Sequence, residues 1–444
     1  MWRTLRLKFC MKIVEEKVEK TEDAPKHFRD LGISESMLKI LAKNKFEIPT
    51  PIQYQAIPIA LSGSDVMGIA QTGTGKTLAF GVPLITRVLE SNNGGLVVVP
   101  TRELAVQVDE TIAQLSREAG LRTAVLIGGT SMYAQVQAIR RGADIIIATP
   151  GRLIDHVEQK TLSLSQVGIV VLDEADRMLD MGFMPQIKRI FNELPVDRQT
   201  MVFSATMPPE ITRIASAHMK LPVRVEMAPA GTTAERVTQE LFIVPRERKL
   251  PLLANILNTT EGSTIVFTKT KHGAKRIVAQ VRALGIKAAE IHSNRTLHQR
   301  REALEGFKTG RYRVLVATDI ASRGIDVSGI ACVINYDMPN NADDYVHRIG
   351  RTARAGAEGH AITFALPFEQ REVRTIERLT RKQIAITPLP QLPQLPEHVR
   401  NAAPRTFDDA PRGRAPRGGF SRGAPRRGVS SAPRRRTDSR PRIR

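Results

Sequence analysis

One short segment, Ala70-Gln-Thr-Gly-Thr-Gly-Lys-Thr77, combines the residue types that hold the phosphates of a nucleotide. Gly73 and Gly75 let backbone N–H groups turn inward around the phosphates. The Lys76 ammonium would reach the β- and γ-phosphates, and the Thr77 hydroxyl would ligate Mg²⁺. A glycine-rich turn with an incidental lysine would mean little by itself. Here the segment follows an apolar run and precedes a helical pattern, so we predict a Walker A loop with alanine in place of its usual first glycine.

A pair of acids, Asp173-Glu174, ends the apolar run Ile169-Val-Val-Leu172. At the end of a strand in the same sheet, Asp173 would hold the Mg²⁺ shell and Glu174 would polarise the water that attacks the phosphate. Such a pair alone is weak evidence, but together with the Walker A loop it indicates hydrolysis of a nucleoside triphosphate. The chain has no second Gly-Lys-Ser/Thr, so the role of its second half must lie in what that half offers to this site.

Short apolar runs alternate with longer amphipathic stretches along most of the chain, and these runs predict the strands that position both motifs. Such an alternation is typical of parallel sheets with helices on both faces. The runs form two groups, so we predict two α/β domains, at 27–225 and 240–386, joined by a linker over 226–239 that contains Ala228-Pro-Ala-Gly-Thr-Thr. The expected strands are 66–69, 96–99, 124–127, 144–147, 169–172, 201–203, 265–267, 313–316 and 332–334.

The charge of the chain favours a polyanion, either a nucleic acid or an acidic membrane surface. Lys and Arg outnumber Asp and Glu by 66 to 45, a net charge of +21. Residues 405–444 hold thirteen arginines and three aspartates, so this segment carries +10. Because it is also rich in Gly, Pro, Ala and Ser, we predict a disordered basic tail. The proline-rich residues 387–404 are expected to form an extended spacer before it.

Composition excludes several other classes of protein. Aromatic residues make up only 5% of the chain, which argues against a protein built on base-stacking platforms. With only Cys10 and Cys332, a disulfide framework is excluded and a reducing cytoplasm fits. No apolar run approaches the ~20 residues that span a bilayer. Residues 1–26 form an N-terminal extension that could contain a short targeting segment, but we favour an over-long start with Met11 as the initiator.

From Asp173-Glu-Ala-Asp176 onward, the motifs follow one another in the order of a known family. The chain resembles the DEAD-box ATP-dependent RNA helicases over about residues 27–375, which implies two RecA-like domains. Details at His292-Ser-Asn-Arg295 and Leu304-Glu-Gly-Phe-Lys-Thr-Gly310 most resemble the bacterial RhlE-type subgroup. Several independent motifs in one order are far more specific than any one of them.

The resemblance implies an adenine pocket in the first domain. Phe28 and Phe46-Glu-Ile-Pro-Thr-Pro-Ile-Gln53 resemble the Q motif, in which Phe28 packs against the base and Gln53 reads its edge. An amide suits this role because it can both donate to adenine and accept from it. The family usually has glycine at the position of Lys45. The expected ATP contacts are Phe28, Gln53, Gln71, Thr72, Gly73, Thr74, Gly75, Lys76, Thr77 and Asp319, and the expected Mg²⁺ ligands are Thr77 and Asp173.

The resemblance also implies RNA contacts in both domains and residues that couple them to ATP. Alone, each of these loops would rank as an ordinary turn after a strand. The expected RNA contacts are Arg102, Gly129, Thr149, Arg152, Thr270 and Thr318. The expected coupling residues are Asp176, Ser204, Thr206, Arg323 and Asp326.

Tyr345-Val-His-Arg-Ile-Gly-Arg-Thr-Ala-Arg354 resembles the last motif of the family. Arg351 and Arg354 would be arginine fingers that reach the γ-phosphate when the domains close, and His347 would help to position the water. The family usually has glycine where this chain has Ala353. A solvated basic face is the simpler alternative for these arginines. The expected catalytic residues are Lys76, Asp173, Glu174, His347, Arg351 and Arg354.

The resemblance implies an ATP-dependent RNA helicase that hydrolyses ATP in a cleft between two domains. RNA that spans both domains would favour closure, and the closed state would separate short duplexes locally, without processive movement. We expect ATP and Mg²⁺ as cofactors, RNA as the partner of the core and of the basic tail, a monomeric core and a cytoplasmic location. Ribosomal particles and RNA-decay enzymes are partners consistent with the family.

Three other functions remain open on the sequence alone. A translocating DNA helicase would share the two-domain engine, but it would tolerate long duplexes. A non-catalytic RNA-clamping scaffold or annealing chaperone would rely on the basic tail, yet the intact catalytic residues argue against it. A metabolic kinase with the same phosphate-binding loop would leave the motifs of the second domain without a role.

Overall fold

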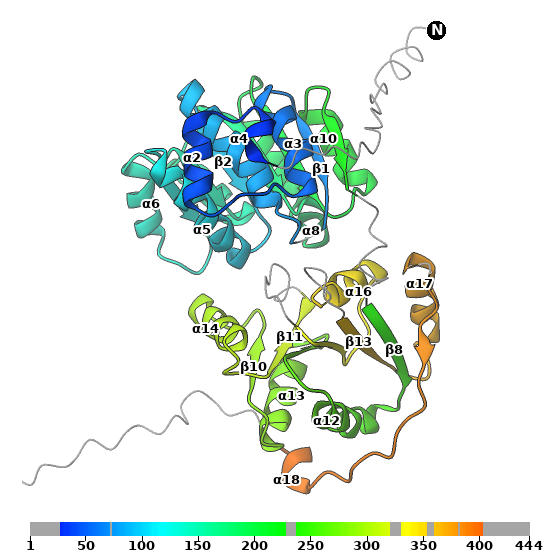
Figure 1. Ribbon diagram of the computed structural model, residues 1–444. Coiled ribbons are helices and arrows are strands. Elements are labelled where there is room, and N and C mark those ends of the chain that lie inside the picture. Colours follow the sequence, from blue (N-terminus) through cyan, green and yellow to red (C-terminus); the bar gives the residue numbers. More distant parts are fainter. Residues whose placement is uncertain are drawn as a thin grey trace, which may run out of the picture. The chain divides into compact units, whose positions relative to one another are not determined.

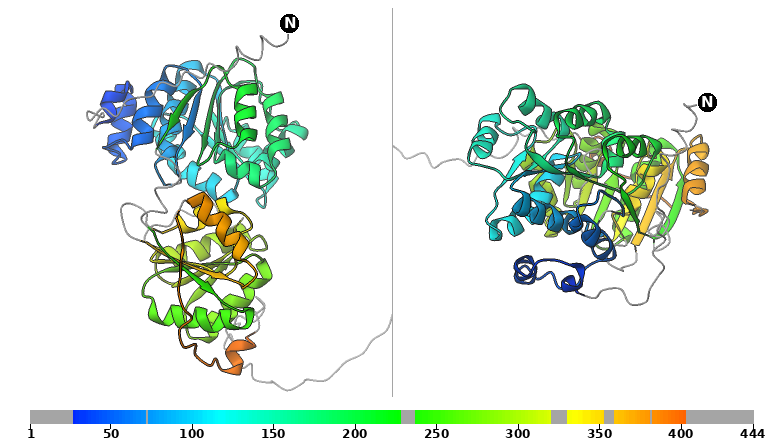
Figure 2. Two further views of the ribbon diagram at one scale, coloured as in Figure 1. Left: turned by 90° about the vertical axis from the view of Figure 1, so that its right-hand side faces the viewer. Right: turned by 90° about the horizontal axis from the view of Figure 1, so that it is seen from above.

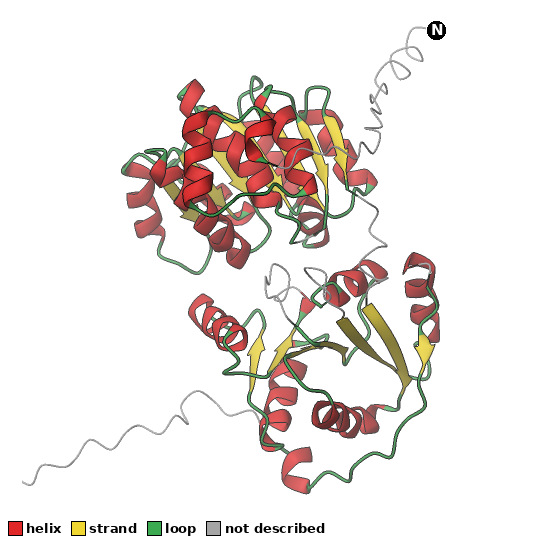
Figure 3. Cartoon of the chain, viewed as in Figure 1, coloured by secondary structure: helices red, strands yellow, loops and turns green. Residues whose placement is uncertain are grey.

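The computed structural model describes residues 27–71, 73–227, 237–319, 330–352, 359–380 and 382–402. Within them the chain forms two seven-stranded sheets. Neighbouring strands in both sheets run parallel, and helices lie between successive strands (Figures 1 and 3). Figure 2 shows helices on either face of the sheet in the first domain. The predicted pair of parallel α/β domains is confirmed.

The first sheet has the strand order β3-β4-β2-β5-β6-β1-β7. Helices cover both of its faces, which is why its inner strands are buried over nearly their whole length and read as continuous apolar runs. The strands are β1 (Val66–Ile69), β2 (Gly94–Val98), β3 (Thr123–Leu126), β4 (Ile145–Ala148), β5 (Val167–Asp173), β6 (Gln199–Ser204) and β7 (Val223–Glu226). The helices are η1 (Phe28–Leu31), α2 (Glu35–Lys43), α3 (Pro51–Leu61), α4 (Lys76–Ser91), α5 (Arg102–Glu118), α6 (Met132–Arg140), α7 (Pro150–Glu158), α8 (Ala175–Asp180), α9 (Met184–Glu193) and α10 (Pro209–His218).

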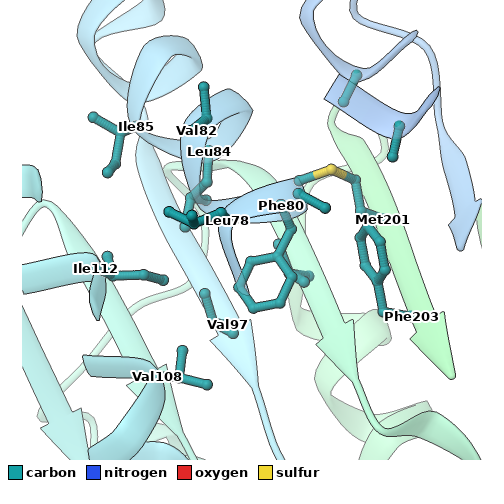
Figure 4. Packing of buried hydrophobic residues seen from close by; sticks show 14 of the residues in the cluster. Leu78, Phe80, Val82, Leu84, Ile85, Val97, Val108, Ile112, Met201 and Phe203 are labelled. Carbon is teal, nitrogen blue, oxygen red and sulfur yellow. The ribbon is translucent and has the colours of Figure 1, made fainter. Parts of the chain in front are cut away.

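Helix α4 ties the predicted Walker A loop to the core of this domain. Phe80 of α4 and Phe203 of β6 are fully buried, with ring centroids 5.5 Å apart, and Figure 4 shows both rings together with Met201. A Cβ atom at Gly68 of β1 would come within 2.5 Å of the Phe203 ring. The strand that leads into the loop therefore needs glycine at this position for the ring to pack.

The second sheet has the strand order β10-β11-β9-β12-β13-β8-β14. Its strands are β8 (Val237–Ile243), β9 (Thr264–Phe267), β10 (Ala288–Ile291), β11 (Val314–Ala317), β12 (Cys332–Asn335), β13 (Gly359–Ala365) and β14 (Ala385–Ile386). The helices are η2 (Arg246–Arg248), α12 (Lys249–Thr259), α13 (Lys271–Ala283), α14 (Leu297–Lys308), α16 (Ala342–Ile349), α17 (Gln370–Thr380) and α18 (Glu397–Arg400).

Five of these strands, β7, β8, β10, β13 and β14, are not among the expected ones. Three of them form edges of the sheets, and β8 is covered on its outer side only by the two-residue β14. Strands at or near an edge tolerate charged and polar residues, so their sequences lack a continuous apolar run. The interior strand β13 also mixes small and polar residues among its apolar ones.

The segment expected to be an extended spacer packs on the second domain up to residue 399. Leu389 and Leu392 contact the hydrophobic cluster on one face of the sheet, and Leu395 and Val399 are buried with Leu250 of α12. Figure 1 shows the segment running along the outside of this domain to α18.

The segments at 1–26, 228–236 and 403–444 lie outside the described residues, so the expected extension, most of the expected linker and the basic tail do as well. Strand β8 begins at Val237, within the range expected for the linker. None of the helices in the described ranges is long and apolar enough to cross a membrane.

Candidate nucleotide and RNA site

The motifs of the first domain fall on two halves of one sheet edge. The Walker A loop follows β1, the acidic pair ends β5 and Ser204 ends β6, and these three strands are neighbours. The predicted RNA loops follow β2, β3 and β4, which are neighbours on the other half. Because the carboxyl ends of parallel strands share one edge, both groups of motifs lie at the same edge of the sheet.

The Walker A loop is built around two glycines with positive φ. Gly73 has φ +85° and Gly75, which precedes the first residue of α4, has φ +87°. The Lys76 Nζ atom donates to the Ala70 carbonyl over 2.9 Å, and Thr74 Oγ1 donates to the Gln71 carbonyl over 2.7 Å. Lys76 therefore forms a hydrogen bond across the loop that is predicted to hold the phosphates.

Gln53 connects α3 directly to the Walker A loop. Its amide nitrogen donates to the Gly75 carbonyl over 2.9 Å, and its amide oxygen accepts from the Thr50 backbone N–H over 2.9 Å. A Cβ atom at position 75 would overlap the Gln53 amide. An amide offers two donor and two acceptor positions, so one of each remains for a ligand. Phe28, the other predicted adenine contact, is buried in the domain core with only 4% of its surface exposed.

Lys45, where the resemblance leads us to expect glycine, lies in a tight turn just before the Q motif. Lys45 is exposed and has φ +63°, in the left-handed region that glycine adopts most easily. Lysine keeps this turn at a cost in backbone energy.

The acidic pair lies at the end of β5, with both carboxylates buried. Asp173 Oδ1 accepts from the Glu174 backbone N–H over 2.9 Å. Burial raises the pKa of Asp173 to about 6, against the opposing charge of Lys76. Glu174 has φ +56° and ψ +51°; of the five described non-glycine residues with positive φ, it alone is buried. Such strain in a buried residue is typical of functional sites.

Arg177 is a buried partner of Glu174 that the sequence did not lead us to expect. Its guanidinium forms an ion pair with the Glu174 carboxylate, and the two side chains are only 2% and 5% exposed. The two residues are three apart at the start of α8, a spacing that brings side chains together on a helix. This spacing was the available signal, and one arginine within a strongly basic chain does not stand out.

Asp176 joins the acidic motif to the loop after β6. Its Oδ2 atom accepts from the backbone N–H groups of Ala205 and Thr206 and from the Thr206 hydroxyl, over 3.1, 2.8 and 3.0 Å. The Asp176 backbone N–H donates to Ser204 Oγ over 3.0 Å. Burial opposes the charge of Asp176, but Lys76 and the hydrogen bond from Thr206 contribute to holding its pKa below the usual value. The three predicted coupling residues of this domain are therefore in direct contact.

The predicted RNA residues of the first domain meet around one tight turn. Gly129 has φ +81°, and a Cβ atom at this position would overlap the Arg102 guanidinium. Arg152 donates to the Thr130 carbonyl over 3.3 Å and to Asp155 Oδ2 over 3.2 Å, and only 15% of its side chain is exposed. Thr149 precedes the first residue of α7 and is buried. Of this group, Arg102 has its side chain exposed, whereas Arg152 is largely engaged within the protein.

In the second domain, Arg348 holds the predicted ribose contact. Its guanidinium donates to both carboxylate oxygens of Asp319, over 2.6 and 2.8 Å, and its side chain is 2% exposed. It also donates to Asn335 Oδ1 and the Asp337 carbonyl, and it lies 5.1 Å from the centre of the Phe267 ring. A bidentate pair fixes the plane of a carboxylate. Arg348 was not predicted, although it lies within the last motif.

The other predicted residues of the second domain lie at strand and helix ends. The Thr270 hydroxyl accepts from the Gly273 backbone N–H at the start of α13, over 2.9 Å. The Thr318 backbone N–H donates to the Ile291 carbonyl over 3.3 Å. Arg351 donates from Nε to the His347 carbonyl over 3.2 Å. The predicted residues outside the described ranges are Thr72, Arg323, Asp326 and Arg354.

Two family models match the chain. Residues 50–214 match the DEAD/DEAH box helicase model, and residues 248–356 match the helicase conserved C-terminal domain. Among curated proteins, the ATP-dependent RNA helicase CshA of Limosilactobacillus reuteri is 40% identical over 385 residues, which cover 86% of this chain and 77% of the relative. The chain belongs to the family of DEAD-box ATP-dependent RNA helicases.

Further relatives agree with this assignment. The DEAD-box ATP-dependent RNA helicase CshA of Bacillus subtilis is 41% identical over 360 residues, 80% of this chain and 73% of the relative. Yeast Dbp5 bound to RNA and ADP BeF3 has a TM-score of 0.73 at 28% identity, covering 82% of this chain and 96% of that one. Mss116p bound to single-stranded RNA and AMP-PNP has a TM-score of 0.75 at 26% identity, covering 84% and 82%.

The two sheets of this DEAD-box protein are thus two RecA-like domains, as the sequence predicted. The chain is an ATP-dependent RNA helicase, an enzyme that hydrolyses ATP to ADP and phosphate and separates RNA strands. A metabolic kinase and a purely non-catalytic scaffold are therefore excluded as its principal function.

Proposed function

We propose that ATP binds at the edge of the first sheet formed by β1, β5 and β6. In this arrangement Lys76 and the loop around it hold the phosphates, Gln53 reads the adenine edge with its remaining donor and acceptor, and Phe28 packs against the base. The observation that carries the proposal is the convergence of Lys76 and the buried carboxylates of Asp173 and Glu174 on one sheet edge.

The residues present fit a Mg²⁺ ion. Asp173 and Thr77 offer a carboxylate and a hydroxyl, the oxygen ligands that Mg²⁺ prefers, and the ion usually completes its shell with water and substrate phosphates. Burial raises the pKa of Asp173 to about 6 because it disfavours the charged form, and a cation beside the carboxylate would stabilise that form. The described ranges contain no cluster of three or more acidic, histidine or cysteine side chains for a metal, which is consistent with a site that relies on substrate and water. When bound, Mg²⁺ would offset phosphate charge.

We further propose that Glu174 polarises the attacking water and that Arg177 holds its carboxylate in place. The second domain completes the site, with Asp319 directed at the ribose by Arg348 and with His347, Arg351 and Arg354 acting at the γ-phosphate. Supplying these groups from another domain makes hydrolysis depend on closure, and arginine fingers typically contribute ~10³–10⁵ in rate. Closure would be favoured by RNA that contacts both domains, so ATP and RNA would strengthen each other's binding.

The proposed RNA contacts of the first domain are Arg102, Gly129, Thr149 and Arg152, and those of the second are Thr270 and Thr318. Arg102 lies beside the glycine turn, where small residues allow close approach of a phosphate. Asp176, Ser204 and Thr206 would couple the ATP site to the rest of the sheet edge. Arg323 and Asp326 would couple the two domains.

The experiment that tests the site is Glu174→Gln. The amide keeps the shape of the side chain but cannot accept a proton, so turnover of ATP in the presence of RNA should fall by at least ~100-fold. Binding of ATP and of RNA, measured by fluorescence titration, should stay within a few-fold of the parent protein. Glu193→Gln, at an exposed position of α9, is the matched control and should leave turnover unchanged. An ATPase rate equal to that of the parent in Glu174→Gln would show that another group activates the water.

Narrower assignments remain predictions. The two bacterial relatives described above carry the name CshA, so they do not support the RhlE-type subgroup. A cytoplasmic location, a monomeric core and ribosomal or RNA-decay partners are consistent with an RNA helicase. Crosslinking in cells followed by RNA sequencing would identify the RNA targets.

A further inference from the structure

A buried histidine is linked to the predicted RNA turn and has no role in the proposed hydrolysis of ATP. His156 of α7 is completely buried. Its Nε2 atom lies 3.0 Å from Gln135 Oε1, and its Nδ1 atom lies 2.8 Å from the Thr161 hydroxyl. Both ring nitrogens therefore have partners within the protein.

Gln135 of α6 links His156 to the turn at 127–130. Its amide nitrogen donates to the Ile127 carbonyl over 2.9 Å and to Thr130 Oγ1 over 2.6 Å. The Thr130 hydroxyl in turn donates to the Ile127 carbonyl over 3.0 Å. Gln135 is 5% exposed, so these bonds are shielded from water.

The bonds of Gln135 determine which nitrogen of His156 carries the proton. A backbone carbonyl can only accept, so the Gln135 nitrogen must face Ile127 and its oxygen must face the histidine. The Nε2 atom of His156 is then the donor to Gln135 Oε1. The Thr161 hydroxyl donates to the His156 backbone carbonyl over 3.0 Å and lies 2.8 Å from Nδ1. Burial, with the charge of Arg152 as a second cause, lowers the pKa of His156, which agrees with a neutral ring.

The turn that this pair supports includes Gly129 and contacts both predicted RNA arginines. Arg152 donates to the Thr130 carbonyl, and the Arg102 guanidinium lies against Gly129. The Arg152 backbone lies one helical turn before His156 on α7. The histidine is therefore linked to the turn through Gln135, and the two arginines contact the same turn.

We propose that His156 and Gln135 are positioning residues for RNA binding, which hold the turn at 127–130 in the conformation that presents its backbone and Arg102 to RNA. This inference rests on the proposed RNA contacts of the first domain. Neither residue belongs to the Walker A loop, the acidic motif or the loop after β6. Their effect is therefore on the affinity for RNA and leaves the affinity for ATP at saturating RNA unchanged.

The experiment compares His156→Leu with His156→Gln in the full-length protein. Leucine fills a similar volume without a donor, whereas glutamine can place an amide N–H near the position of Nε2 and keep the bond to Gln135. The readouts are the KM for single-stranded RNA, the KM for ATP and the kcat at saturating RNA. His218→Leu, a histidine of α10 that stacks on Phe191, is the matched control.

In His156→Leu the KM for RNA should rise about tenfold, the factor that corresponds to ~1.4 kcal/mol and to the loss of a buried hydrogen bond. The KM for ATP and the kcat at saturating RNA should stay within about twofold of the parent values, and His156→Gln should recover most of the RNA affinity. Gln135→Leu should weaken RNA binding at least as much as His156→Leu, because it also removes the bonds to Ile127 and Thr130. The double variant should be no worse than Gln135→Leu alone, because His156 acts on the turn through Gln135.

The inference is overturned if a folded His156→Leu keeps the RNA affinity of the parent, if His156→Gln is as weak as His156→Leu, or if the affinity for ATP at saturating RNA falls together with the affinity for RNA. Arg102→Ala separates this inference from the proposed RNA site on which it rests. Weakened RNA binding in Arg102→Ala with no change in His156→Leu would remove only the positioning role. Unchanged RNA binding in Arg102→Ala would contradict the proposed RNA site itself.

Discussion

Arg177→Met should destabilise the first domain strongly, because it removes the cation that neutralises the buried Glu174 carboxylate. The two side chains are 2% and 5% exposed and form an ion pair at the start of α8. Methionine has a comparable length and fills much of the same space, so the main loss is the charge. In an exposed pair water would take over the role of the lost partner, but here it has little access.

The size of the effect follows from this burial. Removing one partner of a buried ion pair costs ~3–5 kcal/mol, since the remaining charge is left without compensation. For a domain of about 200 residues, each kcal/mol lowers the Tm by ~2–4 °C, so the expected loss is ~6–20 °C. Combining Arg177→Met with Glu174→Gln removes both charges, and such replacements are often close to neutral, so the double variant should regain at least half of the loss.

Thermal unfolding of the parent, the two single variants and the double variant, without nucleotide, measures this coupling. Arg189→Met is the matched control, because Arg189 forms an ion pair with Glu158 in which both side chains are more than half exposed. Its cost should be below ~1 kcal/mol. The losses of the two single variants could simply add in the double variant, or Arg177→Met could have the same Tm as the control. Either result would show that the buried pair does not hold Glu174, and the role of Arg177 in the proposed site must then be abandoned.

Three further results are expected. Because the pKa of Asp173 is raised to about 6, its ionised fraction falls about fourfold between pH 7.5 and 5.5. The Mg²⁺ concentration that half-saturates the ATPase should rise by the same factor, after correction for the protonation of ATP itself. An unchanged Mg²⁺ concentration would contradict the role of Asp173 as a metal ligand. Lys45→Gly should stabilise the first domain by ~0.5–1 kcal/mol in thermal unfolding because of the φ of +63°, whereas Lys45→Ala should give no gain. Deleting 405–444 should weaken RNA binding and flatten its salt dependence by roughly 0.7 in the log–log slope for each RNA phosphate that the tail neutralises. Exchanging the thirteen arginines of this segment for lysine should preserve the slope, and an unchanged slope after deletion would assign the tail to another partner.

The features that could be predicted from sequence are those in which a short continuous segment carries the whole signal. The Walker A loop is a strand, a turn and a helix in succession, and Asp173 and Glu174 directly end an apolar strand. Inner strands such as β5 are buried on both faces, so their apolar runs stand out. Edge strands such as β7 and β10 lacked that signal because each contains at least one charged residue.

The residues that were missed act through contacts between segments far apart in sequence. Arg348 pairs with Asp319 over 29 residues, and His156 bonds to Gln135 over 21. Nothing in either local sequence states that the other member is near, because the contact exists only once the strands between them are ordered in the sheet. Arg177 is only three residues from Glu174, but it lies just outside the motif, which ends at Asp176, so the motif did not predict a role for it.

The buried arginines change what the net charge of +21 means. A basic composition suggests surface arginines waiting for a polyanion, yet Arg177 and Arg348 are each 2% exposed and each neutralises a carboxylate of the proposed ATP site. Burying an arginine is costly unless it is paired and hydrogen-bonded, so such residues are present for the acid that they hold. In one domain the acid is the proposed base for hydrolysis, and in the other it is the proposed ribose contact. Some of the positive charge of this helicase therefore serves to orient the anions of its own nucleotide site, and only the exposed remainder, Arg102 among it, is available to attract RNA.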